Sequence, residues 1–399
     1  MKRFSEFRMP QAVFYGIESL TKLGEQAALF GKKALIISDK IMDQIGNVEK
    51  CRHYLEAAGL TTASYLEVNS EPTDVHVSEA LTAFQQNQCE LIVSVGGGSC
   101  IDAAKAVAVL ATNGGYIGDY MGGRKPIACK PIPLIAIPTT AGTGSEVTSV
   151  TVITNTKDDI KMMIKDPAFI PAVAIVDPVL TYSTPRSVTA ATGVDALCHA
   201  MEAYISRLAQ PLTDQLALSA IELIVNNLRT AYQNGKDQEA REKMALASMQ
   251  AGLAFTNASV TLVHGMSRPV GALFHVPHGI SNAMLLPAVL EYTKESAVER
   301  LAVIGRLLRP DLTGLSQEEL ADVTVNEVKK LCSDLNIPNM KDYGLNREKF
   351  NEVVAKMATD ASASGSPGNN PRVPSHEEII ELYNLCYDYD FTTLEKVAN

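Results

Sequence analysis

The 399-residue sequence has a deficit of positive charge and no long apolar stretch. It contains 35 Lys and Arg against 45 Asp and Glu, a formal net charge of −10 at pH 7. A general nucleic-acid-binding protein needs a basic face that neutralises phosphates, so this balance favours small ligands. No run of about 18 apolar residues occurs, and the first residues, MKRFSEFRMP, lack the apolar core of a signal peptide. We therefore expect a cytoplasmic protein without membrane spans.

The cysteines form no C-x-x-C pair. There are seven of them, an odd number, and they are scattered at Cys51, Cys89, Cys100, Cys129, Cys198, Cys332 and Cys386. This pattern excludes a disulfide framework and a zinc ribbon, so we expect reduced thiols in the core. With 46% hydrophobic and 20% charged residues, the chain is long enough for two globular domains.

Strand and helix patterns alternate through the first half. Short apolar runs typical of buried strands occur at 33–38, 62–68, 90–95 and 133–138, and helical patterns follow the first three. Further strands are expected at 149–155 and 172–177. Alternation of this kind predicts an α/β domain with a mostly parallel sheet. Ligands of such sheets bind beyond the carboxyl ends of the strands, so the loops there are candidate binding sites.

A glycine loop, Gly96-Gly97-Gly98-Ser99, follows the strand at 90–95 and opens a helix that carries Asp102 and Lys105. Glycines let backbone N–H groups approach a phosphate closely, and the helix N-terminus adds partial positive charge. The competing interpretation is a tight turn that only requires glycine. The loop is neither G-x-G-x-x-G nor a Walker loop, which argues against a P-loop nucleotidase.

Two other strand ends carry suitable residues. Asp39, after the strand at 33–38, can accept hydrogen bonds from a ribose diol, and its charge would repel a 2′-phosphate, which favours NAD over NADP. It is equally compatible with a solvated turn. The segment 138–146, PTTAGTGSE, combines small residues and hydroxyls that can enclose a flat cofactor.

The second half shows helical periodicity throughout. Helices are expected at 185–206, 212–233, 238–255 and 259–273, and the first begins at Thr184-Pro185, with a capping hydroxyl followed by proline. The domain boundary therefore falls near 180–185. The segment 362–372, SASGSPGNNPR, is predicted to be a loop because of its glycines and prolines.

Asp195 and His199 lie four residues apart, so on a helix they share one face, a turn apart. His264 follows in a second helical stretch, and His278 lies in the turn Val276–Gly279. Four such side chains can hold one divalent ion, and three imidazoles with one carboxylate suit Fe(II) or Zn(II). Buried His and Asp that satisfy one another in an ordinary core are an equally good interpretation of this pattern alone.

Four segments together resemble the iron-containing, or group III, alcohol dehydrogenases: GGGSCIDAAK, PTTAGTGSE, GVDALCHAMEAYIS and an HG pair separated by twelve residues. The resemblance covers nearly the whole chain. It implies a dehydroquinate synthase-like fold, with an NAD-binding α/β domain at 1–183, an all-helical metal-binding domain at 184–399 and an active site in the cleft between them. It also implies a homodimer.

The resemblance further implies which residues act. The metal ligands, through which catalysis proceeds, are Asp195, His199, His264 and His278. The NAD-binding positions are Asp39, Gly97, Gly98, Ser99, Asp102, Thr139, Thr140, Ser145, Lys161 and Leu180. Val152 and Phe255 are implied to line the substrate pocket. Glu71 departs from the asparagine often found there and is left out of the cofactor site.

The expected function is an NAD-dependent, iron-dependent alcohol dehydrogenase or aldehyde reductase for a small primary alcohol or diol. One departure matters: many relatives carry a proton-relaying histidine where this chain has Arg268, and arginine cannot act as a general base. His275 is a weak substitute, typical of core or helix packing. Arg268 instead suggests a different substrate, an aldehyde bearing a carboxylate or sulfonate, although an arginine on the helix paired with a carboxylate is the favoured interpretation. Two further functions compete with these: a dehydroquinate synthase-like lyase and a non-catalytic nucleotide sensor.

Overall fold

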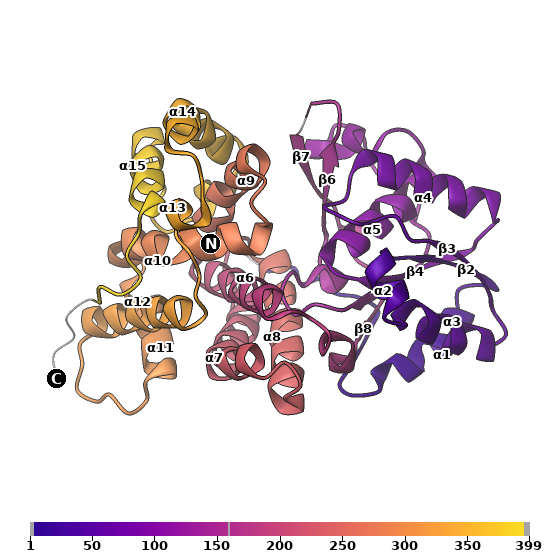
Figure 1. The fold of residues 1–399 in the computed structure, drawn as a ribbon, viewed down its shortest axis with the longest axis horizontal. Coiled ribbons are helices and arrows are strands. Elements are labelled where there is room, and N and C mark those ends of the chain that lie inside the picture. The colour runs from indigo at the N-terminus through magenta and orange to yellow at the C-terminus, as the bar shows by residue number, and fades with distance from the viewer. Residues whose placement is uncertain (1–3, 159, 395–399) are drawn as a thin grey trace. The chain divides into compact units, whose positions relative to one another are not determined.

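The computed structural model describes residues 4–158 and 160–394, which divide into two compact units (Figure 1). One unit spans Phe7–Thr184, and the other joins the described residues up to Glu6 with those from Pro185 onward. The sequence predicts a domain boundary between residues 183 and 184, one residue before the division between Thr184 and Pro185. No helix among the described residues is long and apolar enough to cross a membrane.

The first unit is built on a six-stranded, all-parallel sheet with the order β1-β8-β5-β4-β2-β3. The predicted mostly parallel sheet is therefore confirmed. Its strands are β1 (Ala12–Tyr15), β2 (Lys33–Ile37), β3 (Thr61–Tyr65), β4 (Leu91–Gly96), β5 (Leu134–Pro138) and β8 (Val173–Val176). The short edge strand β1 is not predicted from the sequence, because four residues carry too little periodic signal.

Alternate side chains of the central strands enter two separate cores. In β2, Leu35 and Ile37 belong to the core that receives α4 and α5, whereas Ala34 and Ile36 belong to the core that receives α1 and α3. Helices thus cover both faces, as a buried parallel sheet requires. The helices are α1 (Leu23–Ala28), α2 (Lys40–Gln44), α3 (Asn47–Ala57), α4 (Asp74–Gln86) and α5 (Gly98–Asn113).

The helix expected after the first strand is in fact two. Gly46, with φ +82°, ends α2 and begins α3, because that backbone conformation cannot continue a right-handed helix. An antiparallel hairpin of β6 (Val150–Asn155) and β7 (Ile160–Lys165) forms a second, smaller sheet. Five 3₁₀ turns complete the unit: η1 (Ser19–Lys22), η2 (Ile117–Gly123), η3 (Ser145–Val147), η4 (Pro167–Phe169) and η5 (Pro178–Thr181).

The second unit is helical, with no strand among its described residues. Its elements are α6 (Arg186–Ile205), α7 (Pro211–Gln233), α8 (Gln238–Asn257), α9 (Leu262–Phe274), α10 (His278–Thr293), η6 (Lys294–Ser296), α11 (Val298–Leu308), α12 (Gln317–Asp334), α13 (Met340–Tyr343), α14 (Arg347–Ala363), η7 (Ser366–Asn369) and α15 (His376–Tyr387). The four helices predicted at the start of this unit agree with α6–α9 within three residues at each end.

Three local predictions are wrong. The Thr184 hydroxyl does not cap α6, because it donates to the Thr139 carbonyl at 3.3 Å and Pro185 occupies the N-cap. The segment 362–372 is not all loop, since α14 extends to Ala363 and a 3₁₀ turn follows it. Cys129 is exposed, whereas the other six cysteines are buried free thiols, as expected.

Close packing of α11 against α12 depends on Gly305. A Cβ atom added there would lie 2.0 Å from the Leu320 carbonyl oxygen, a backbone atom that cannot move without shifting α12. Gly305→Ala should therefore lower the thermal unfolding midpoint, since overpacking typically costs about 1–3 kcal/mol. Gly368→Ala is the matched control, because no heavy atom lies within 4 Å of its added Cβ. Equal midpoints for both variants in calorimetry would contradict this account.

Candidate metal centre and nucleotide loops

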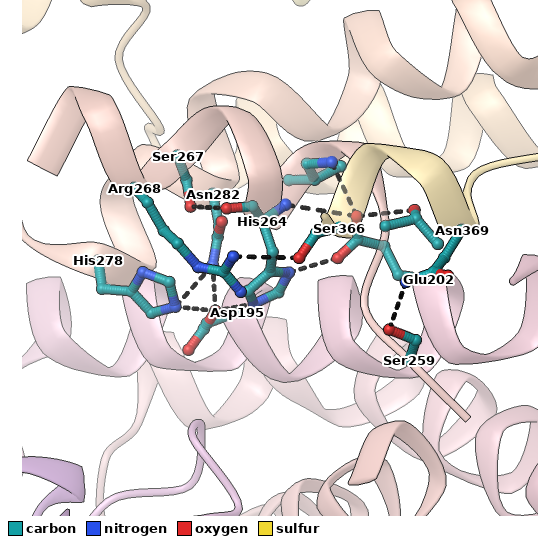
Figure 2. A network of polar contacts seen from close by, with 12 residues as sticks. Asp195, Glu202, Ser259, His264, Ser267, Arg268, His278, Asn282, Ser366 and Asn369 are labelled. Carbon is teal, nitrogen blue, oxygen red and sulfur yellow. Dashed lines mark hydrogen bonds and ion pairs between the residues drawn. The ribbon is translucent and has the colours of Figure 1, made fainter. Parts of the chain in front are cut away.

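Four side chains from three helices converge in the second unit. Asp195 and His199 come from α6, His264 from α9 and His278 from the first residue of α10. Figure 2 shows Asp195, His264 and His278 near one another. One ligand atom from each lies within 4.8 Å of all the others, and the first three side chains are buried. The Asp195 Oδ1 atom lies 3.6 Å from His264 Nε2 and 3.8 Å from His278 Nε2. The side chains that the sequence singled out are thus brought together.

The helix α6 places these groups on one face. Most of its residues are buried, so it is apolar on nearly all sides except along Asp195, His199 and Glu202. These residues follow the i, i+4, i+7 spacing that aligns side chains along a helix. Sequence reasoning missed Glu202, although the same spacing pointed to it.

Glu202 holds His264 in position. Its Oε2 atom bonds the Nδ1 of His264, while Oε1 accepts from the Thr261 hydroxyl at 2.9 Å and from the Val263 N–H at 2.7 Å. A hydrogen bond from Nδ1–H to this carboxylate leaves Nε2 as the ring nitrogen with a free electron pair, facing Asp195. A carboxylate behind a histidine in this manner is the usual support of a metal ligand.

Asn282 of α10 completes the cluster. Its Nδ2 atom lies 2.6 Å from Asp195 Oδ1, 3.1 Å from His264 Nε2 and 3.2 Å from His278 Nε2. Its Oδ1 atom is buried without a hydrogen-bond partner among the described residues. An orphaned oxygen beside a carboxylate and three imidazoles fits a site that takes a cation.

The electrostatics agree with this fit. Burial alone would raise the pKa of Asp195, but His199, His278 and His264 hold it well below its usual range. Burial alone would lower the pKa of His264, but Glu202 and Asp195 raise it. Asp195 among the three imidazoles and Glu202 behind His264 thus favour positive charge in the cluster. Three nitrogen ligands and one oxygen ligand suit Fe(II) or Zn(II).

The other residues that were expected near the cluster lie in different places. The Phe255 ring stacks on the His199 ring, with centroids 4.3 Å apart. Val152 belongs to the other unit, on β6, where its N–H donates to Asp102. His275 is neither in the core nor packed within a helix: it is exposed and ends α9 in a left-handed conformation, with φ 55°.

In the first unit, Asp39 and the glycine loop lie together beyond the carboxyl ends of β2 and β4. The Asp39 carboxylate accepts from the Met42 N–H at 2.9 Å and from the Cys100 thiol at 3.6 Å, so it caps α2 and touches the start of α5. No side chain caps α5, which leaves its first N–H groups available to an anion. This arrangement suits a phosphate-bearing ligand.

Packing within the protein requires glycine at some positions of the loop but not at others. A Cβ at Gly96 would lie 2.6 Å from the Cys100 sulfur, and one at Gly98 would lie 2.8 Å from the Thr143 methyl group. Packing within the protein therefore explains both, as the tight-turn interpretation requires. Gly97 has ordinary contact distances to Thr140, 3.7 Å or more, so packing does not require glycine at this position.

Several predicted cofactor positions form a buried internal network. Asp102 accepts from the Ser145 hydroxyl at 2.6 Å and from the Val152 N–H at 2.9 Å. The Lys105 ammonium donates to the Thr148 hydroxyl at 2.9 Å and the Val150 carbonyl at 2.8 Å. These bonds tie the segment 138–146 and β6 to α5, so Asp102 and Ser145 shape the loop from within.

The remaining predicted positions vary in exposure. Thr139 is buried and Thr140 is half-buried at the end of β5. Leu180 is buried in the core that contains α1 and α3. Ser99 is half-buried in the first turn of α5. Lys161 pairs with Glu71 at 2.7 Å, so the residue that departs from the family pattern contacts a predicted cofactor position.

Removing the charge behind His264 should weaken metal binding. Glu202→Gln keeps the shape of the side chain but makes a weaker bond to Nδ1, so we expect divalent-ion affinity to fall about tenfold to a hundredfold. Competition with a chromogenic chelator measures it. Glu222→Gln, on the exposed face of α7, is the matched control and should bind like the wild type. An unchanged affinity in the Glu202 variant would remove this residue from the site.

Comparisons with known proteins agree with both units. Residues 10–178 match the family model described as iron-containing alcohol dehydrogenase, and residues 189–387 match that of the C-terminal part of the Fe-containing alcohol dehydrogenase family. The 1,3-propanediol dehydrogenase of Klebsiella pneumoniae is 39% identical over 389 residues, 96% of this chain and 99% of that one. The lactaldehyde reductase of Escherichia coli K12 is 39% identical over 358 residues, 89% of this chain and 92% of that one.

Solved structures agree as well. The crystal structure of a 1,3-propanediol oxidoreductase superposes with a TM-score of 0.92 at 39% identity, covering 96% of this chain and all of that one. An α/β unit and a helical unit with a ligand set of one aspartate and three histidines are thus found in a chain similar to enzymes that oxidise alcohols or reduce aldehydes. The chain belongs to the iron-containing alcohol dehydrogenase family.

Proposed function

We propose that the protein transfers a hydride between a small primary alcohol or diol and NAD, with Fe(II) in the site of Asp195, His199, His264 and His278. The observation that carries this proposal is the convergence of these four side chains, with Glu202 behind His264 and Asn282 beside Asp195. The relatives named for propanediol, methanol and lactaldehyde act on small substrates, which supports the same class here.

The residues of this chain have separate tasks in that reaction. Asp195 and the three histidines would hold a divalent ion, which supplies a Lewis acid that lowers the pKa of the alcohol or polarises the aldehyde. Glu202 fixes the ring of His264, and Phe255 fixes that of His199 by stacking. Fixed ligands keep the reacting oxygen in one place, and this orientation is a large part of the catalytic gain. Zn(II) fits the same donors, and the family favours iron.

NAD is assigned to the loops of the first unit. The uncapped start of α5 would receive the diphosphate, with Gly97 allowing close approach, and Asp39 would accept from the ribose diol. We include the remaining predicted positions in this proposal: Gly98, Ser99, Asp102, Thr139, Thr140, Ser145, Lys161 and Leu180. The nicotinamide carbon and the alcohol carbon must meet for transfer, so we propose that both sets of residues serve one substrate.

We also propose a cytoplasmic homodimer. The edge strand β1 supports the proposal of a dimer, because only one side of this strand is paired within the sheet. Tyr15 at its end and the nearby Ile17 are 60% and 47% exposed. An unpaired edge with apolar side chains is a surface that proteins usually cover.

Stripping the metal should abolish turnover. Protein treated with a chelator is expected to lose alcohol-dependent NADH formation and to regain it with Fe(II) or Zn(II), whereas Asp195→Ala should stay inactive with either ion. Absorbance of NADH follows the reaction over a panel of small alcohols and aldehydes. Full activity of the stripped Asp195→Ala protein would reject the proposal, and product formation without net change in NADH would favour the lyase instead.

The charge of Asp39 should set the preference for NAD. Asp39→Ser retains a capping oxygen for α2 but removes the negative charge, so the ratio of kcat/KM for NADP to that for NAD should rise about tenfold or more. Asp43→Asn, an exposed residue of the same helix, is the control and should leave the ratio as it is. A ratio that does not move in the Asp39 variant would place the ribose elsewhere.

A further inference from the structure

Arg268 extends its side chain along the metal site. It lies on α9 four residues after His264, so the two side chains share one face of that helix, one turn apart. Its Nη1 atom donates to the buried Ser366 hydroxyl at 3.0 Å, which anchors the guanidinium to η7 (Figure 2). Position and anchor together fix a cation beside the candidate metal ligands.

This guanidinium has no acidic partner within the described chain. None of the ion pairs among the described residues involves Arg268, and its hydrogen bond to Ser366 goes to a neutral hydroxyl. The acid that influences it electrostatically is Glu202, which is already engaged by His264, Thr261 and Val263. The arginine–carboxylate pair that would have explained Arg268 structurally is therefore absent from the described residues.

The charge of Arg268 is nevertheless retained. Burial lowers the pKa of Arg268 to about 10, with Glu202 opposing the shift, so the side chain stays protonated at neutral pH. Each of its side-chain nitrogens either has a hydrogen-bond partner or is accessible to solvent. The N–H groups that Ser366 does not use are therefore open to water or to a ligand.

The charge balance of the site with a divalent ion bound also indicates that Arg268 lacks a counter-charge. Asp195 and Glu202 contribute two negative charges, which a divalent ion would neutralise, and His264 would then serve as a neutral ligand. Arg268 then remains as one uncompensated positive charge in a partly buried setting. A half-buried charge without a counter-charge is incompletely solvated, and a ligand of opposite charge would compensate it.

We propose that Arg268 selects an aldehyde that carries a carboxylate or sulfonate, which its free N–H groups bind at two oxygens. This inference rests on the proposed function, since it names the substrate class of the same site. NADH would supply the hydride to the carbonyl carbon and solvent the proton to its oxygen, giving a hydroxy acid and NAD. Arg268 takes no part in the transfer and acts by positioning the anionic end.

Matched pairs of aldehydes test the proposal. Glyoxylate, succinic semialdehyde and glutaric semialdehyde are each assayed beside the unbranched aldehyde with the same number of carbons, using metal-loaded wild type. We expect at least one acidic member to exceed its partner in kcat/KM by about tenfold to a hundredfold. In Arg268→Gln this ratio should fall towards one, chiefly through KM. Arg268→Lys should keep part of this preference, because an ammonium keeps the positive charge but lacks the paired N–H donors of a guanidinium.

The matched control is Arg207→Gln. Arg207 also contacts the segment of Ser366, through Nη1 to the Gly368 carbonyl at 3.3 Å, but on an exposed side chain. Its substitution should leave the preference for acidic aldehydes intact. A wild type without any such preference, or a preference that survives in Arg268→Gln, would overturn the inference.

A measurement on the wild type alone covers the case in which the variant does not fold. The methyl ester of the acidic aldehyde that the wild type prefers differs from that acid only in its esterified carboxylate, so the acid should be the better substrate by a similar factor. Equal efficiency for acid and ester would contradict the role of Arg268. Turnover of the uncharged aldehydes with NADH would still support the proposed function, whereas no turnover of any aldehyde or alcohol would reject that function itself.

Discussion

Buried charge must be paired, and the helical unit is arranged around that requirement. Asp195 and Glu202 are each about 1% exposed, so each needs donors or cations in contact with it. The helix α6 places both on one face. His264 of α9 and His278 and Asn282 of α10 contact Asp195. What results is a cluster whose acidic and imidazole groups satisfy one another incompletely. A divalent ion would supply the positive charge that two buried carboxylates favour.

In the α/β unit, buried hydrogen bonds hold the loops that we assign to NAD. Its loops are held by side chains that face inward, with Asp102 bonded to Ser145 and Lys105 bonded to Thr148. These buried bonds fix the segment 138–146 against α5, so the outer surface of the loop is preformed. Residues that the family resemblance assigns to NAD binding thus divide between those placed to touch a ligand and those that shape the loop from behind.

Arg268 connects the chemistry of the site to the choice of substrate. The same helix carries it and His264, and the 3₁₀ turn at Ser366–Asn369 anchors its guanidinium. That turn is also tied to the rest of the helical unit, since Asn369 donates to the Ser259 hydroxyl and Arg207 to the Gly368 carbonyl. A cation anchored to a turn that is itself held in place is preorganised, so less conformational entropy is lost when it binds an anion.

The sequence by itself predicted the alternation of strands and helices, the change to helices near residues 180–185 and the placement of Asp195 and His199 on one face of a helix, because these depend on periodicity and on spacing along one helix. The addition of His264 and His278 as candidate ligands rested on residue type and family resemblance, because both lie on other helices. It did not determine the break between α2 and α3, the inward role of Asp102 or the bond from the Thr184 hydroxyl to Thr139. Only the tertiary structure decided that Glu202 orients His264, that Asn282 joins Asp195 and that Arg268 lacks an acidic partner. The contacts involved join residues that are separated in the sequence by 62, 87 and 98 positions. Local sequence carries no signal for the partner of a side chain at such separations.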